Sequence, residues 1–81
     1  MNKRVKLLEA MRNNPRDWRI DDLLVVAKQF DLECRNNGGS HHVFSFSDLE
    51  MDVTVPAHRP IKPVYIRQFM LLIDAVKELK K

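Results

Sequence analysis

The side chains best suited to proton transfer in this 81-residue chain are its three histidines, and His41 and His42 directly follow a turn sequence. That turn contains Gly38 and Gly39, and glycine tolerates the positive φ values that tight hairpins require. Side chains alternate between the two faces of a strand, so His41 and Phe44 are predicted to lie on opposite faces. If Phe44 faces the core, His41 faces solvent, where a substrate reaches it.

The third histidine, His58, lies in a segment that carries three cations and no acidic residue, namely Arg59, Lys62 and Arg67. An imidazole titrates near neutral pH, and cations stabilise charge that develops on a phosphoryl group. RNA cleavage needs little more, because the ribose 2′-hydroxyl supplies the nucleophile. The residue types therefore favour metal-independent RNA cleavage, with His41 as the proton-transfer group.

Other chemistries have less support. Zinc usually takes three or four ligands, and Cys34 and the histidines lack the paired spacings of such sites, so we predict no metal and no cofactor. Ser40 precedes His41 without an evident acid to complete a triad, and is expected to bond to the turn backbone. No glycine-rich phosphate loop leads into a helix, which argues against nucleotide hydrolysis.

Each histidine also has an ordinary structural explanation. His42 shares the predicted face of Phe44, which favours a histidine at the edge of the core. His58 fits a phosphate contact and simple solvent exposure equally well. A surface histidine in a turn is the plain alternative for His41.

The apolar periodicity predicts the elements that position these groups. Helices are expected at residues 3–13, 20–31 and 63–79, and strands at 32–35, 41–46 and 51–55. This order, α-α-β-β-β-α, predicts a two-layer α+β domain whose three-stranded antiparallel sheet has one polar face and packs its other face on helices. The predicted core stripe of the last helix comprises Ile66, Phe69, Met70, Ile73, Val76 and Leu79.

Composition sets the class of protein. With 44% hydrophobic and 31% charged residues, the chain fits one globular domain over residues 1–81, and its net charge of +3 is compatible with a polyanionic partner. It has no apolar run the length of a bilayer span, no secretory signal at its N-terminus and a lone Cys34. We therefore expect a cytoplasmic protein that does not enter a membrane.

Gly39-Ser40-His41-His42-Val43-Phe44 resembles the G-S-H-x-x-F segment of the HicA toxin family, the RNA-cleaving halves of HicA/HicB toxin–antitoxin pairs. The resemblance extends over residues 14–79. It takes in Asp21-Asp22-Leu23-Leu24, Val53-Thr54-Val55-Pro56, His58 and the segment from Lys62 to Gln68. Residues 1–13 add a helix that compact members lack. This helix could pad the core, extend an RNA surface or meet a partner.

The resemblance implies a fold similar to a double-stranded-RNA-binding domain and an mRNA-cleaving toxin with His41 as its catalytic residue. It also implies an antitoxin partner similar to HicB that covers the active face. We expect Ser40, His58, Arg59, Lys62 and Arg67 to contact RNA. Two alternatives remain open: a non-catalytic RNA-binding module that uses the same basic surface, and a protein-interaction domain that docks through its first helix.

Overall fold

The computed structural model describes residues 3–36, 38–58 and 60–80, with side chains from residue 7 onward. The elements are α1 (Lys3–Asn13), α2 (Ile20–Gln29), β1 (Glu33–Asn36), β2 (His41–Ser45), β3 (Asp52–Pro56) and α3 (Pro63–Leu79). The α+β class and the order α-α-β-β-β-α are therefore confirmed. Arg59 and Asn37 lie outside the described residues, so the prediction for Arg59 is not placed.

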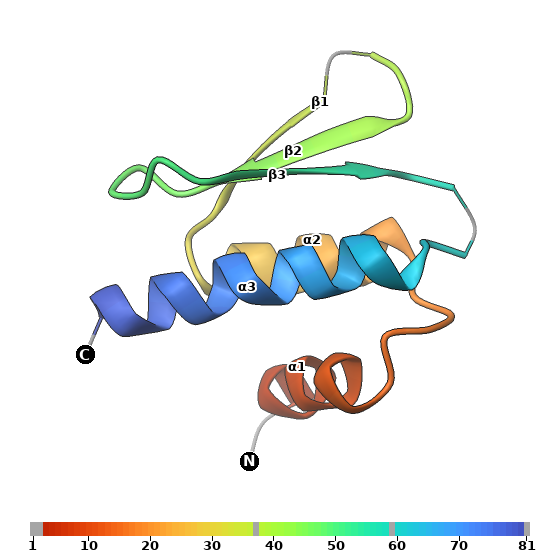
Figure 1. Cartoon of the computed structure of the whole chain (residues 1–81), viewed down its shortest axis with the longest axis horizontal. Helices are drawn as coiled ribbons and strands as arrows, with labels where there is room; N and C mark the ends of the chain where they lie inside the picture. Colours follow the sequence, from red (N-terminus) through yellow and green to blue (C-terminus); the bar gives the residue numbers. More distant parts are fainter. Residues whose placement is uncertain (1–2, 37, 59, 81) are drawn as a thin grey trace.

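The three strands form an antiparallel sheet in the order β1-β2-β3. Figure 1 shows the sheet lying over α2 and α3, with α1 on the opposite side of that helix pair. Phe44 of β2 lies opposite Cys34 of β1 and Val53 of β3, so these three residues share the face toward the helices. Thr54 and Asp52 of β3 are exposed on the other face, which confirms the expected polar side of the sheet.

The core lies between the sheet and the helices. Phe44 and Phe69 meet edge to face, with ring centroids 5.0 Å apart. The first helix also contributes, because Leu8 and Met11 of α1 are buried in the same cluster. Of the three roles open to this helix, padding the core is thus established.

The second helix ends two residues earlier than expected. Its last residue is Gln29, and Asp31 adopts a φ of 60°, in the left-handed region. The N–H of Leu32 then donates to the carbonyl of Ala27 at 2.9 Å, a bond typical of a Schellman helix end. Because aspartate rather than glycine occupies the left-handed position, the sequence carries no obvious stop signal there.

The third helix confirms its predicted bounds, with Pro63 in the first turn. Its predicted core stripe is wrong at one position, since Leu79 is 51% exposed, and it omitted Leu72, which is fully buried. The last turn of α3 extends past α1 and α2, which explains the exposure of Leu79 (Figure 1). Among the described helices, none is both long and apolar enough to cross a bilayer.

Candidate active site

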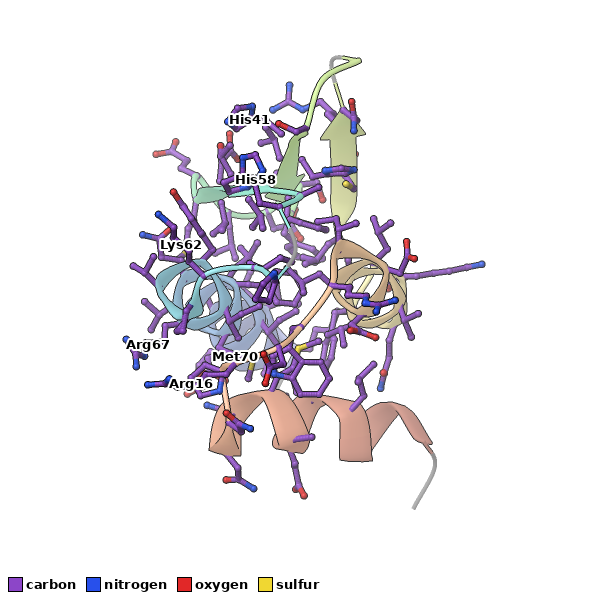
Figure 2. The ribbon with its side chains drawn as sticks, turned by 90° about the vertical axis from the view of Figure 1, so that its right-hand side faces the viewer. Arg16, His41, His58, Lys62, Arg67 and Met70 are labelled. Atoms are coloured by element: carbon purple, nitrogen blue, oxygen red, sulfur yellow. The ribbon has the colours of Figure 1, made fainter. Side chains whose placement is uncertain are left out.

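An open hollow of about 490 Å³ lies where the sheet meets the start of α3. Its lining residues are His41, Pro56, His58, Pro60, Lys62 and Tyr65. Figure 2 shows His41, His58 and Lys62 on the same side of the molecule, with His41 at the end of the sheet. Residues from β2, from the loop after β3 and from α3 therefore meet at one place. The structure thus brings together three of the residues that the sequence singled out.

His41 is the first residue of β2 and is exposed. Phe44, on the other face of the same strand, is fully buried. The predicted alternation is therefore confirmed: packing of Phe44 into the core turns the imidazole of His41 outward. An exposed imidazole at the rim of a hollow is accessible to a substrate from solvent.

A backbone hydrogen bond holds the loop after β3 against the start of β2. His41 pairs with Pro56 at the end of the sheet, and the N–H of Ala57 donates to the carbonyl of Ser40 at 2.6 Å. His58 follows directly after this bond. The antiparallel pairing thereby carries His58 to the end of the strand on which His41 lies.

Lys62 is the residue before the first turn of α3, with an extended backbone at φ −62° and ψ 141°. It is exposed at the positive end of the helix dipole, which favours bound anions. Tyr65 lies one turn into the helix, where it lines the hollow and packs against the core. Lys62 and the helix terminus thus place positive charge on the side of the hollow that faces His41.

The neighbouring His42 is arranged quite differently. Its side chain is half-buried, and its Nε2 lies 2.9 Å from Nδ2 of Asn36. The Oδ1 of Asn36 accepts from the N–H of Gly38 at 2.7 Å, so the amide nitrogen is the group that faces His42. Nε2 of His42 therefore accepts from the amide of Asn36, and its buried Nδ1 has no hydrogen-bond partner among the described residues. His42 therefore helps to hold the turn through Asn36, and it lies at the edge of the core as the sequence predicts.

Two other predicted residues lie outside the hollow. Ser40 is exposed, and its carbonyl rather than its hydroxyl makes the contact described above. Arg67 is exposed on α3 and lines a separate hollow of about 290 Å³ beside α1. It lies on the same side of the molecule as Lys62 but further from His41 (Figure 2).

Sequence reasoning missed one cation of this region. Arg16, in the loop between α1 and α2, lines a hollow with Lys62 and Pro60. Its charge is the only sequence signal that Arg16 offers, because Arg16 belongs to no periodic pattern and lies far from Lys62 in the sequence. Only the folded chain brings the two cations together.

Three cations on this side of the molecule are not neutralised by a neighbouring carboxylate of the described chain. Arg12 pairs with Asp74, Arg35 with Asp52 and Lys80 with Asp31. In the described part of the chain, no ion pair is made by Arg16, Lys62 or Arg67. These unpaired cations leave the side that holds His41 ready for an external anion.

Two groups elsewhere have shifted pKa values. Hydrogen bonds from Arg12 lower the pKa of Asp74, and burial raises the pKa of the Cys34 thiol. Neither group lines the hollow with His41. Within residues 3–36, 38–58 and 60–80, no three His, Cys, Asp or Glu side chains gather closely enough to hold a metal ion.

Comparison of this chain with models of protein families, with curated proteins and with solved structures found no match.

Proposed function

We propose that this protein is a metal-independent endoribonuclease that cleaves mRNA in the cytoplasm. The observation that supports it is the shared hollow of His41, His58 and Lys62, which combines two imidazoles with a cation that pairs with no described carboxylate. Together with the resemblance of its Gly39–Phe44 segment, this hollow favours a toxin similar to HicA. The partner proposed on the same grounds is an antitoxin similar to HicB that covers the hollow.

The reaction needs one proton taken and one proton given. The 2′-oxygen loses its proton to His41 and attacks the adjacent phosphorus, while the bond from phosphorus to the 5′-oxygen breaks. The leaving 5′-oxygen takes a proton from His58, the second imidazole of the hollow. The products are a 2′,3′-cyclic phosphate and a 5′-hydroxyl end. Lys62 and the start of α3 bind the phosphoryl oxygens, on which negative charge grows in the transition state.

The direct test is cleavage of a structured mRNA by the wild type and by His41→Ala in the presence of a chelator. A positioned acid or base contributes about 10²–10⁴-fold in rate, so the variant is expected to lose that factor and to stop inhibiting growth. His41 is exposed, so its removal should leave the fold intact. Lys28→Ala is the control, because Lys28 is exposed and lies outside the hollow. A folded His41→Ala protein that cleaves at the wild-type rate would falsify the proposal.

A non-catalytic RNA-binding module is the second candidate, favoured by the unpaired cations on this side of the molecule. Duplex RNA is recognised largely through phosphates and 2′-hydroxyls, which cations alone can contact. Lys62→Ala should weaken binding and reduce its salt dependence under either function. Only the nuclease loses turnover in His41→Ala while keeping its affinity for RNA, so comparing these two variants separates the candidates.

A further inference from the structure

A second hollow adjoins the one that holds His41. It measures about 370 Å³ and is lined by Arg16, Asp17, Pro60, Ile61, Lys62 and Pro63. Lys62 and Pro60 line both hollows, so the two adjoin at these residues. Figure 2 places Arg16 further along the same side of the molecule, with Lys62 between Arg16 and His41. A strand that leaves the first hollow past Lys62 would enter the second.

The loop that carries Arg16 is fixed by several hydrogen bonds. Oδ1 of Asn14 accepts from the N–H of Arg16 at 3.2 Å, and the carbonyl of Asn14 accepts from Nε1 of Trp18 at 2.6 Å. Asp17 adopts a φ of 65°, which turns the chain sharply between them. Trp18 is half-buried and packs against the core. The backbone that carries Arg16 is therefore fixed by the fold.

The same loop is joined to the loop after β3. The N–H of Ile61 donates to the carbonyl of Trp18 at 3.0 Å, and Ile61 itself is buried. This bond lies directly before Lys62 in the sequence. Arg16 and Lys62 are thus held on two loops that are tied together, as a preformed pair of cations requires.

We propose that Arg16 binds a second phosphate of the RNA strand, the one next to the cleaved phosphate that Lys62 contacts, with Lys62 lying between the two phosphates. This inference rests on the proposed function. Arg16 makes no ion pair within the described chain, and its planar guanidinium suits the spread charge of a phosphodiester. The substrate is accordingly a strand that continues past the cleaved bond on one side.

Asp17 lines the same hollow and is exposed, so its carboxylate faces the bound strand as well. Like charge opposes phosphate binding there. Removing the charge of Asp17 should strengthen phosphate binding, whereas removing Arg16 should weaken it. Asn tolerates the left-handed φ of this position, so Asp17→Asn changes the charge without straining the loop.

The test uses the full chain and measures kcat/KM on oligoribonucleotides that are lengthened by one nucleotide at a time, on the 5′ side or on the 3′ side of a mapped cleavage site. The kcat/KM of the wild type is expected to rise about tenfold when the strand acquires the second phosphate, because one charged contact has about this effect. Arg16→Ala and Arg16→Gln should lose that gain, and Asp17→Asn should increase it. Lys28→Ala, which removes an exposed cation outside both hollows, should keep the wild-type pattern.

Salt dependence gives a second readout on the same variants. Each phosphate contact with a single strand adds about 0.7 to the slope of log affinity against log salt, so Arg16→Ala should lower that slope by about this amount. Thermal melts verify that the variants fold. If the wild type cleaves RNA but Arg16→Ala shows the same gain with length, the subsite is refuted and the nuclease stands. If the folded wild type cleaves no RNA at all, both proposals fall.

Discussion

The N–H of Ala57 lies 2.6 Å from the carbonyl oxygen of Ser40, and each of these residues is followed directly by a histidine. The bond continues the antiparallel pairing one step beyond His41 and Pro56. It therefore fixes the relative position of His41 and His58, the two imidazoles of the hollow. A single main-chain contact thus controls whether the candidate active site is assembled.

Removing this contact should harm turnover more than stability. Ala57→Pro deletes the donor, and one lost hydrogen bond costs about 0.5–1.5 kcal/mol of unfolding free energy. We expect RNA cleavage to fall about tenfold or more, because a small displacement of a catalytic group has a large effect on rate. Urea denaturation and single-turnover cleavage measure the two effects. Ala57→Ser keeps the N–H and should behave as the wild type; equal activity in both variants would show that the contact is dispensable.

Asn36 offers a second way to perturb the site from a distance. Its side chain joins the N–H of Gly38 to Nε2 of His42, on the turn that leads into His41. Asn36→Ala removes both bonds and is expected to cost about 1–2 kcal/mol of unfolding free energy and to lower the cleavage rate at saturating RNA. Chemical denaturation and initial rates provide the measurements.

Asn36→Asp is the control for this variant. The carboxylate still accepts from the N–H of Gly38, and the imidazole of His42 can carry its proton on Nε2 and donate to it, so Asn36→Asp should keep more of the wild-type stability than Asn36→Ala. A cleavage rate that is unchanged in Asn36→Ala would show that the turn does not position His41.

The first helix is expected to be indispensable to the fold. Met11 is fully buried, and truncating a buried methionine to alanine costs about 2–5 kcal/mol. Met11→Ala should therefore lower the midpoint of thermal unfolding markedly yet cleave RNA normally at temperatures where it stays folded. Glu9→Gln, at an exposed position of the same helix, should melt as the wild type does. A Met11→Ala melt identical to that of the wild type would mean that α1 does not dock on the core.

The sequence predicted those parts of the site that depend on local periodicity. The alternation of His41 with the buried Phe44 needed only the strand pattern, and the placement of Lys62 followed from Pro63 opening the last helix. The meander of three strands also brought the loop of His58 to the correct end of the sheet, since short connections force antiparallel neighbours.

The missed features depend on contacts between distant segments or on unusual backbone conformations. Asp17 and Asp31 adopt left-handed φ values without glycine, so neither turn had a clear marker. Arg16 lines the same hollow as Lys62 because the bond from Ile61 to Trp18 joins their two loops, and no periodicity encodes that bond. Leu79 fits the apolar stripe, but a side chain is buried only where another element packs against it. The last turn of α3 extends beyond α1 and α2, so Leu79 remains exposed.

The ion pair between Arg12 and Asp74 predicts how stability depends on pH. The two side chains are joined by a bidentate contact, with distances of 2.5 and 3.1 Å, which lowers the pKa of Asp74 in the folded protein. A carboxyl group whose pKa is lower in the folded state stabilises the fold above its unfolded pKa, about 4, and this contribution is lost as pH falls through the folded value. The side chains are 46% and 42% exposed, so solvent screening keeps the contribution below about 1 kcal/mol.

Asp74→Asn should therefore be less stable than the wild type at neutral pH, and the difference should shrink once the pH falls below about 4. Urea denaturation of both proteins across this pH range measures the difference in unfolding free energy. Glu50→Gln is the control, since Glu50 is exposed and makes no ion pair with the described residues. A difference that stays constant with pH would show that Asp74 acts through packing rather than charge. Because this pair joins α1 to α3 on the side away from the sheet, Asp74→Asn should cleave RNA at the wild-type rate at neutral pH as long as it is folded.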